Sequence, residues 1–384
     1  MTADPKSAPQ DALAAATTAA RAWLCDVAAP VWAHRGRTAS GLFPERMHLD
    51  GTPDPAYYRV FVQSRQVYSF AVIGAMGWAG PWQALIAETM AALVAGARRA
   101  DGFYVHKLDG DARPLDARAD LYDQAFVLLA LATAGRALAA PHWFDVAEEL
   151  LDTIERHWAH PHGGFTEGEK DDPRIRRQNP HMHLLEAALA LSEASGRPRF
   201  AAFAAMIADL AARRFIDPAT GALLEYFTDD LRPAPGIEGR IVEPGHCFEW
   251  AWLFERLGRQ GRPGAIAVAD RLVSFARAHG LCAARGVCIN EVLTDGSRHD
   301  GRARLWPQTE RIKAAAIRLA RTGDPAEASE ALAALAGLHQ YTKVPTPGLW
   351  RDKLNPDGSW LPELAPGSSL YHIACAYAEL PSIG

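Results

Sequence analysis

Three histidines in this 384-residue chain stand near the start of apolar segments, where an imidazole could accept and return protons. His183 lies in NPHMHLLEA, His246 in EPGHCFEWAW and His372 in SSLYHIACAY. An unperturbed imidazole titrates close to neutral pH, so it is well suited to general acid–base catalysis. A single histidine on a helix is more often structural than catalytic, but three in matching contexts indicate chemistry.

Comparable polar motifs open three further apolar segments, QSRQVYSFA, DLYDQAFVL and RLWPQTERIKA. One residue from each motif recurs at nearly even intervals along the chain: Arg65, Tyr122, His183, His246, Glu310 and His372. Asp123, beside Tyr122, is a further expected substrate-binding residue, and His181 is treated as a residue near the site. Two motifs share the pattern H-x-x-E, which predicts that Glu186 orients His183 and that Glu249 orients His246 from the same helix face.

Helix start signals place these side chains in first turns. Asn179 reads as an N-cap before Pro180, prolines at 244 and 307 read the same way, and Ser368 or Ser369 could cap the last helix. Free backbone N–H groups and the helix dipole disfavour an imidazolium there. The expected site therefore combines neutral histidine bases with stabilisation of a developing oxyanion.

The elements that must position these groups come from a repeat. A glycine followed by apolar residues recurs at nearly even intervals, at Gly41, Gly102, Gly164, Gly221, Gly286 and Gly348. Chance is the competing explanation, but six near-even occurrences speak against it. Ala/Leu-rich segments between the glycines suffice for two helices per unit, and such hairpins must stack or close to bury both faces.

Six helical hairpins predict an all-α (α/α)6 barrel, with residues 1–384 as one catalytic domain and about the first ten residues disordered. The inner helices should be apolar nearly all round. The glycine clusters should form loops or short strands at one rim, with glycine where the chain turns sharply. The six polar motifs would then converge on the barrel axis at one end.

Composition excludes several classes of protein. A net charge of −5 and a pI near 6.3 offer no basic face for nucleic acid. Five scattered cysteines without a C-x-x-C pair indicate neither a disulfide framework nor a zinc site. The start lacks the positive charge and continuous apolar run of a signal peptide, and Arg136 interrupts the apolar stretch around residues 125–140, so we expect a cytoplasmic protein without membrane contact.

The repeated H-x-x-E could instead bind a metal, as carboxylate and histidine pairs do in di-iron bundles. That pattern normally runs E-x-x-H and needs further bridging glutamates, so we expect no metal and no cofactor. Trp250 and Trp252 are expected in the core, whereas Trp306, beside the polar ring, is expected to line the pocket. Arg174, Arg176 and Arg177 could receive an anionic substrate, although such a cluster is usually a solvated loop.

The motifs NPHMHLLEA, EPGHCFEWAW, RLWPQTE and SLYHI, with VQSRQVYSFA upstream, resemble the N-acylglucosamine 2-epimerase superfamily, which includes mannose isomerases and cellobiose 2-epimerases. The similarity runs from about residue 30 to the C-terminus. It implies an (α/α)6 barrel and metal-independent sugar epimerisation or isomerisation. By position it implies acid/base roles for His246 and His372, an active-site role for His183, and substrate contacts or positioning by Arg65, Trp306, Glu249 and Glu310.

Such a reaction opens the sugar ring, removes the C2 proton and forms an enediolate whose charge needs a donor such as Arg65. Return of the proton to C1 gives a ketose, and return to the opposite face of C2 gives an epimer. We expect an isomerase of the D-mannose/D-fructose type, with His372 as the C2 base and His246 as its partner, acting as a monomer or homodimer. The alternatives are a sugar 2-epimerase (N-acylglucosamine, mannose/glucose or cellobiose type) and a glycoside hydrolase, which would need a pair of lumenal carboxylates.

Overall fold

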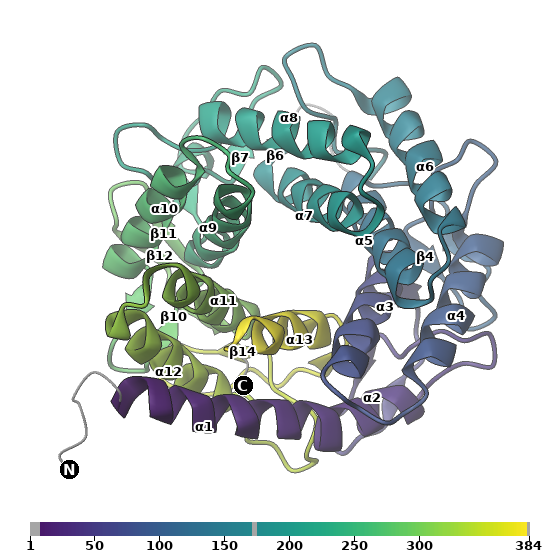
Figure 1. Cartoon of the computed structure of the whole chain (residues 1–384), viewed down its shortest axis with the longest axis horizontal. Coiled ribbons are helices and arrows are strands. Elements are labelled where there is room, and N and C mark those ends of the chain that lie inside the picture. Colours follow the sequence, from purple (N-terminus) through teal and green to yellow (C-terminus); the bar gives the residue numbers. More distant parts are fainter. Residues whose placement is uncertain (1–7, 171–174, 382–384) are drawn as a thin grey trace.

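The computed structural model describes residues 8–170 and 175–381, which form a closed ring of helices in two layers (Figure 1). Within these residues six inner helices surround the axis: α3 (Val60–Ala75), α5 (Leu121–Ala137), α7 (Gln178–Ser195), α9 (Pro244–Arg259), α11 (Trp306–Thr322) and α13 (Ser369–Glu379). The outer layer consists of α1 (Ala8–Ala22) with α2 (Ala29–His34), α4 (Trp82–Ala92), α6 (His142–Trp158), α8 (Pro198–Arg214), α10 (Ala265–His279) and α12 (Pro325–His339). Outer and inner helices alternate along the chain, which confirms the (α/α)6 barrel.

Three shorter helical segments complete the helices. π-Helical turns at Trp23–Ala28 and Leu93–Ala97 join α1 to α2 and extend α4, and a 3-10 turn spans Glu238–Arg240. α1 begins at Ala8, so residues 8–10 are helical rather than disordered, and residues 1–7 lie outside the described residues.

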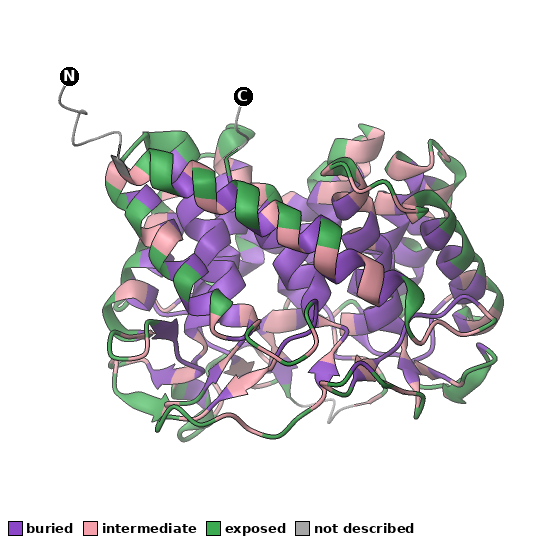
Figure 2. Cartoon of the chain, turned by 90° about the horizontal axis from the view of Figure 1, so that it is seen from below, coloured by how far each residue is buried: buried purple, intermediate pink, exposed green. Residues whose placement is uncertain are grey.

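Short antiparallel strands gather at the rim where the inner helices begin (Figure 2). They are β1 (Arg46–Met47), β2 (Pro53–Asp54), β3 (Tyr58–Arg59), β4 (Lys107–Leu108), β5 (Pro114–Asp116), β6 (Arg176–Arg177), β7 (Tyr226–Phe227), β8 (Ile241–Val242), β9 (Leu281–Cys282), β10 (Val287–Cys288), β11 (Glu291–Leu293), β12 (Arg298–Asp300), β13 (Ala303–Arg304), β14 (Lys353–Leu354) and β15 (Ala365–Pro366). β1 pairs with β15, Arg46 opposite Pro366, so the first loop is tied to the last.

The two rims differ in the length of their connections. The segment that leads from the outer helix α8 into the inner helix α9 runs from Phe215 to Glu243, whereas the turn from the inner helix α7 to α8 consists of Gly196 and Arg197 alone. The other units repeat this contrast between long and short connections. The long connections lie at the end of the barrel where the inner helices start, which we call the loop end. The short connections lie at the opposite end, which we call the turn end.

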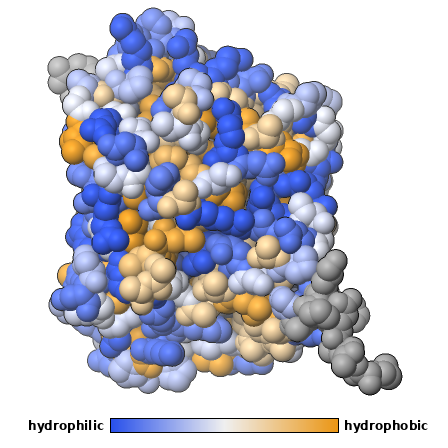
Figure 3. Space-filling view, turned by 90° about the vertical axis from the view of Figure 1, so that its left-hand side faces the viewer, coloured by the Kyte–Doolittle hydropathy of each residue, from blue (hydrophilic) through white to orange (hydrophobic). Residues whose placement is uncertain are grey.

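Burial separates the two helical layers as expected. Thirteen of the 17 residues of the inner helix α5 are buried, against seven of 17 in the outer helix α6. An inner helix contacts both the lumen and the outer layer, so apolar residues cover almost its whole surface, whereas an outer helix keeps a polar stripe towards water. The outward side over α10 and α12 accordingly mixes hydrophilic and hydrophobic residues (Figure 3).

The six repeat glycines all lie at turns that need a left-handed backbone. Their φ angles are positive, between 64° and 96°. At Gly348 a side chain would also meet the backbone, because an added Cβ would lie 2.8 Å from the carbonyl oxygen of Val27. Most residues other than glycine pay a steric cost in this conformation. The repeat in the sequence is therefore a repeat of one turn in the fold.

Buried glutamines attach these turns to the inner helices. The side-chain amide of Gln63 accepts the backbone N–H of Phe43 at 2.7 Å and donates to the carbonyl oxygen of the same residue at 3.0 Å. Gln124 makes the same pair of bonds to Tyr104, and Gln308 makes it to Cys288. Each glutamine follows its partner at the same separation in sequence, so this pair of hydrogen bonds is a feature of the repeat.

Contacts between the first and last helices close the ring. α13 packs against α3 and α11, and α1 packs against α12. The indoles of Trp32 and Trp350 stack with centroids 4.8 Å apart, and Nε1 of Trp32 donates to the carbonyl oxygen of Gly348 at 3.0 Å. In the part of the chain that the structure describes, every helix is too short or too polar to cross a membrane.

The predicted caps are partly wrong. α7 begins at Gln178, so Pro180 is its third residue and Asn179 is not its cap. Ser368 precedes α13 but makes no capping bond through its side chain. Pro244 and Pro307 do lie in first turns, where their missing N–H groups cost nothing. His246 and His372 therefore lie in the first turn of their helices, whereas His183 lies one turn deeper.

Candidate active site

The three predicted histidines line one cavity of about 390 Å³ at the loop end of the lumen. Other expected site residues line it too: Arg65, Tyr122, Glu249 and Trp306. These residues come from all six inner helices, and each is held close to the helix start. The structure therefore brings together side chains from nearly the whole length of the chain, from Arg65 on α3 to His372 on α13.

His246 is held as a proton donor by carboxylates behind it. Its Nδ1 lies 3.0 Å from Glu225 Oε2 and 3.9 Å from Glu243 Oε2. Burial by itself would lower the pKa of His246, but these two carboxylates outweigh burial and raise the pKa to about 9. At neutral pH His246 is therefore an imidazolium, contrary to the expectation of a neutral base at a helix start.

Gln178 and Trp250 orient the carboxylate of Glu225. Nε1 of Trp250 donates to Oε1 of Gln178 at 2.5 Å, which turns the amide nitrogen of Gln178 towards Glu225 Oε2, 2.8 Å away. Trp250 is fully buried, as predicted, yet it belongs to the support of His246. The imidazolium thus stands at the end of a chain of directed hydrogen bonds.

His372 is held in the opposite protonation state. Its Nδ1 lies 2.8 Å from Glu310 Oε1. Burial, with the nearby positive charges of Arg65 and Lys313, lowers the pKa of His372 well below its ordinary value. An ionised Glu310 can only accept a hydrogen bond, so beside it Nδ1 would carry the proton and Nε2 would be the free proton acceptor for the cavity.

Trp306 lies between these two histidines. Its ring centroid is 4.7 Å from that of His246 and 5.8 Å from that of His372. The indole lines the cavity, as predicted. An aromatic face there can stack on the apolar face of a sugar ring and hold its reacting carbons between an acid and a base.

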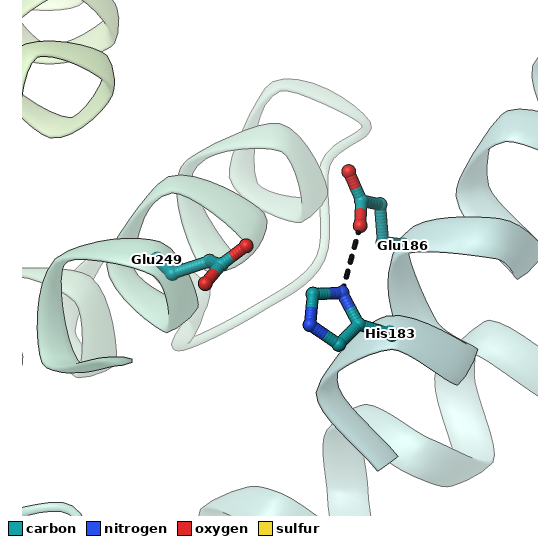
Figure 4. Close-up of side chains that lie close together, drawn as sticks. All are labelled: His183, Glu186 and Glu249. Carbon is teal, nitrogen blue, oxygen red and sulfur yellow. Dashed lines mark hydrogen bonds and ion pairs between the residues drawn. The ribbon is translucent and has the colours of Figure 1, made fainter. Parts of the chain in front are cut away.

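His183 forms a second buried pair with the glutamate three residues later, as the H-x-x-E pattern predicted (Figure 4). Nδ1 of His183 lies 3.1 Å from Glu186 Oε2, and the hydroxyl of Tyr371 donates to Glu186 Oε1. Burial lowers the pKa of His183 to about 4, although Glu186 opposes this shift. His183 is therefore a neutral imidazole facing the same cavity.

Arg65 supplies a positive charge to the cavity from α3. Its Nη2 donates to the hydroxyl of Tyr122 at 2.7 Å, and its guanidinium lies 4.2 Å from the ring centroid of Phe126 and 4.9 Å from that of Tyr371. Aromatic faces hold a guanidinium without neutralising it. Arg65 therefore keeps a full charge for an anionic intermediate.

Glu249, on the neighbouring helix α9, lies within 4.8 Å of His183 and Glu186 (Figure 4). The carboxylates paired with His246 are those of Glu225 and Glu243, so Glu249 does not orient His246 as the second H-x-x-E pattern predicted, although it helps to raise the pKa of His246. The carboxylate nearest His246 is that of Glu225, which lies in the loop before α9. Residues three apart share one face of a helix, but the imidazole of His246 points towards the rim, where this loop lies. Burial and the neighbouring Glu310 raise the pKa of Glu249 to about 8, although Lys313 opposes them.

Three predicted site residues lie behind the cavity wall. Glu310 supports His372 from behind, and Glu186 reaches the cavity only through His183. Asp123 is fully buried, and its Oδ2 lies 2.7 Å from Nδ1 of His106, so the prediction that it contacts substrate is not supported by its position.

His181 supports the fold as the buried glutamines do, and it does not line the cavity. Its Nε2 accepts the backbone N–H of Phe165 at 3.0 Å, and its Nδ1 lies 3.0 Å from the carbonyl oxygen of Arg177. Burial lowers the pKa of His181 to about 3, so it remains neutral. In the third unit it makes the first of the two bonds that glutamines make in three others, and Arg176 donates to the carbonyl oxygen of Phe165 instead.

In the arginine cluster before α7, the side chain of Arg176 serves the fold. Arg176 is buried, and its Nη2 donates to the carbonyl oxygens of Gly163 and Phe165 at 2.7 and 2.9 Å. The backbone N–H of Arg177 donates to Glu167 Oε1 at 2.7 Å. Arg174 lies outside the described residues.

Several supporting residues escaped the sequence analysis. Glu225, Gln178, Glu243, Tyr371 and Lys313 hold the histidines or their glutamates. A signal existed for Glu225, because a polar residue stands three or four positions after each repeat glycine: Glu45, His106, Glu167, Glu225, Asn290 and Asp352. The loops thus carry their own repeated set of polar partners for the inner helices.

Three groups of carboxylates and imidazoles in the described residues have metal-ligand spacing: His183 with Glu186 and Glu249, His246 with Glu225 and Glu243, and His372 with Glu249 and Glu310. Each already contains a bond between its histidine and a glutamate. Lys313 lies among the carboxylates of the third group, 2.6 Å from Glu310 Oε2. A cation beside these glutamates is therefore supplied by the protein.

Comparison with known proteins shows the family of this chain. The family model for N-acylglucosamine 2-epimerase (GlcNAc 2-epimerase) matches residues 41–376. The chain is 42% identical over 369 residues to a mannose-6-phosphate isomerase from Rhizobium meliloti (strain 1021), covering 93% of this chain and 95% of that protein. It is 31% identical over 249 residues to a D-mannose isomerase from Thermobifida fusca, covering 58% of this chain and 59% of that protein.

Solved structures show the same fold. A crystal structure of D-mannose isomerase superposes with a TM-score of 0.83 at 21% identity, over 99% of both chains. A cellobiose 2-epimerase from Bacillus thermoamylovorans B4167 superposes with a TM-score of 0.86 at 18% identity, over 94% of this chain and 98% of that one. With a family model that spans most of the barrel and a relative similar over nearly the whole length, the chain belongs to the N-acylglucosamine 2-epimerase family.

Proposed function

We propose that the protein is an aldose–ketose isomerase that interconverts D-mannose and D-fructose or closely related sugars. One observation carries the proposal: two histidines on either side of Trp306 are held in opposite protonation states, His246 charged and His372 neutral. Two titratable groups whose pKa values are driven apart mark an acid and a base. Isomerisation needs both at once.

Ring opening comes first. A proton must reach the ring oxygen and another must leave the anomeric hydroxyl. His246, kept as an imidazolium by Glu225 and Glu243, can supply the first proton and, once neutral, accept the second. The histidine ends this step as it began, so it is ready for the next one.

Proton transfer between the carbons follows. Neutral His372 takes the C2 proton through Nε2 while His246 protonates O1, which gives an enediol whose developing charge Arg65 stabilises. His372 then returns its proton to C1, and His246 takes the proton from O2. The products are a ketose and the original protonation states of both histidines.

A 2-epimerase is the second candidate, and one feature favours it. His183 on α7 and His372 on α13 are both neutral imidazoles, and their helices lie opposite each other in the ring (Figure 1). Removal of the C2 proton by one and return by the other would invert C2. The isomerase is preferred because acid and base flank the indole that would hold the sugar.

A phosphorylated substrate is supported by the name of the Rhizobium relative. Three cationic side chains line the cavity near its rim, but each is paired: Arg59 with Glu45 at 2.6 Å, Arg304 with Glu243 at 2.8 Å and Lys353 with Glu363 at 2.7 Å. A phosphate would have to compete with these carboxylates. This pairing favours a neutral sugar.

Proton NMR in D2O tests the reaction and its substrate together. Separate samples contain mannose, glucose, fructose, N-acetylglucosamine and mannose 6-phosphate. The proposal expects mannose and fructose to interconvert, with deuterium entering C2 of mannose. Conversion of mannose only to glucose would establish the epimerase, faster turnover of mannose 6-phosphate would establish the phosphorylated substrate, and no turnover of any sugar would overturn the proposal.

We further propose that the reaction needs no metal or other cofactor, and that one catalytic domain works in the cytoplasm as a monomer or homodimer. The buried cation beside the glutamates is Lys313, so the protein itself supplies the positive charge that a metal ion would bring there. Activity should survive exhaustive treatment with EDTA. Loss of turnover that only a divalent cation restores, with the fold intact by circular dichroism, would contradict this.

A further inference from the structure

A fully buried lysine lies directly beneath the candidate site. Lys313 stands on α11 one turn after Glu310, and it is the single fully buried lysine among the described residues. Its Nζ lies 2.6 Å from Glu310 Oε2 and 3.8 Å from Glu249 Oε1. On its other side the ammonium lies 3.8 Å from the ring centroid of Trp252.

Burial of an ammonium is costly, so its surroundings must compensate. Three glutamates from three inner helices act on Lys313: Glu186, Glu249 and Glu310. Burial alone would lower the pKa of Lys313, but the neighbouring Cys375 and these three glutamates raise it well above its ordinary value. This shift favours the charged form of Lys313 at neutral pH.

The contact between Lys313 and Glu310 also affects the pKa of Glu310. Burial raises the pKa of Glu310, and Lys313 is the group that most strongly opposes this rise. Without the ammonium, Glu310 would share its pocket with Glu249 and Glu186, and three buried carboxylates without a cation would take up protons. Lys313 thus favours the ionised form of Glu310 beneath His372.

We infer that Lys313 is a positioning residue: by keeping Glu310 ionised, it fixes the tautomer of His372 that leaves Nε2 free to accept a proton. An ionised Glu310 can only accept a hydrogen bond, so Nδ1 of His372 must carry the proton. A protonated Glu310 would donate to Nδ1 and drive the proton to Nε2. The inference rests on the proposed function, in which Nε2 is the C2 base.

The charged and titratable groups facing His372 and Lys313 come from five inner helices: Arg65 (α3), His183 and Glu186 (α7), Glu249 (α9), Glu310 (α11), and Tyr371 and Cys375 (α13). Arg65 and Lys313 both disfavour an imidazolium at His372. Removal of Lys313 should therefore change two things, the ionisation of Glu310 and the tautomer of His372.

The test compares Lys313→Met with Arg256→Met. Arg256 is a fair control, because its guanidinium lies 4.9 Å from the centroid of the same Trp252 but is paired with Glu193 towards the turn end. We expect Lys313→Met to lower kcat for mannose by at least about tenfold at pH 7, the scale of an acid–base effect, with little change in KM. We expect Arg256→Met to stay near the rate of the unmodified protein.

Two readouts separate this role from a merely structural one. The pH profile of Lys313→Met should gain an acidic limb that lies at higher pH than in the unmodified protein, because activity requires ionised Glu310, so part of the lost rate should return as pH rises. Nitrogen-15 NMR of labelled histidine should show His372 protonated on Nδ1 in the unmodified protein and on Nε2 in Lys313→Met at pH 7.

A double variant keeps the inference testable if Lys313→Met folds poorly. Replacement of Glu310 by Gln leaves no carboxylate to ionise, so Lys313→Met should add little to the loss already caused by Glu310→Gln. An unchanged tautomer and an unshifted pH profile in a folded Lys313→Met protein would overturn the inference. Because the tautomer is read without turnover, an inactive unmodified protein would contradict the proposed function and leave this measurement intact.

Discussion

The two ends of the lumen carry cavities that differ in size and in chemistry. The turn-end cavity is the larger, about 560 Å³ against about 390 Å³ at the loop end. Its charged residues include Arg256, which is paired with Glu193 at 2.8 Å. At the loop end three imidazoles are held by glutamates in two different protonation states.

Connection length explains this difference. The long segments at the loop end fold back over the helix starts and bring residues such as Glu225 to the histidines, whereas the short turns at the other end can only join two helices. Volume therefore does not locate the candidate site in this barrel. The site lies where loops can supply partners to helix side chains.

The largest expected effect comes from removal of the two loop-end histidines. His246→Ala and His372→Ala should each lower kcat by about a hundredfold or more, because each removes a proton-transfer group, while the melting temperature changes little. With fructose in D2O, His372→Ala should fail to exchange a C1 hydrogen, whereas His246→Ala should still exchange it, more slowly, from open-chain fructose through an enediolate that Arg65 stabilises. Full exchange in both variants would refute the assignment of base and acid.

The second test changes the charge behind His246. With its pKa raised to about 9, His246 is protonated at neutral pH, so activity should fall as pH rises through about 9. Glu225→Gln removes one of the carboxylates responsible and should move this alkaline limb to lower pH, with about a tenfold loss of rate at pH 8. An alkaline limb at the same pH in both proteins would exclude His246 as the acid.

The pair of His246 and Glu225 also predicts how the stability of the protein depends on pH. A group whose pKa is higher in the folded than in the unfolded state contributes stability below its unfolded value, near 6.5, and this contribution is lost as pH rises through about 9. The unmodified protein should therefore lose more stability than Glu225→Gln between pH 6.5 and 9. Urea unfolding at these two pH values measures the difference.

Glu186 links the two ends, since it lines the turn-end cavity and holds His183 at the loop end. Glu186→Gln keeps its volume but removes the charge that orients Nδ1 of His183. A 2-epimerase, in which His183 is the second base, should lose about tenfold in kcat, between the effects of His372→Ala and Arg256→Met, whereas the proposed isomerase, which does not use His183, should stay near the rate of Arg256→Met. A rate equal to that of Arg256→Met would mean that His183 takes no part in the reaction.

The smallest effect is expected for His181, an imidazole of the loop end that serves only the fold. His181→Gln should keep both activity and stability, because glutamine makes the corresponding bond in three other units. His181→Ala should cost about 1–3 kcal/mol of unfolding free energy by leaving the buried N–H of Phe165 without its partner. A large loss of kcat in folded His181→Gln would show that this histidine acts in catalysis.

Much of the architecture could be predicted from the sequence because it depends on periodic patterns. The glycine at each repeated turn has a positive φ, and the apolar runs between them became the buried inner helices. His183, His246 and His372 could be found for the same reason, since each stands at the start of such a run. Helix spacing also predicted the pair of His183 and Glu186, which are neighbours on one face.

The protonation states of the histidines were decided only by the tertiary structure. His246 and His372 look alike in sequence, each in the first turn of an apolar helix, yet one lies beside Glu225 from a loop and the other beside Glu310 from the adjacent helix together with Lys313. Coulombic interactions act through space at a few ångströms, and closing the ring determines which charges come that close. The sequence by itself determined which residues could reach the axis, and the packing of six helices and their loops decided which imidazole is charged, which are neutral and which only holds the fold.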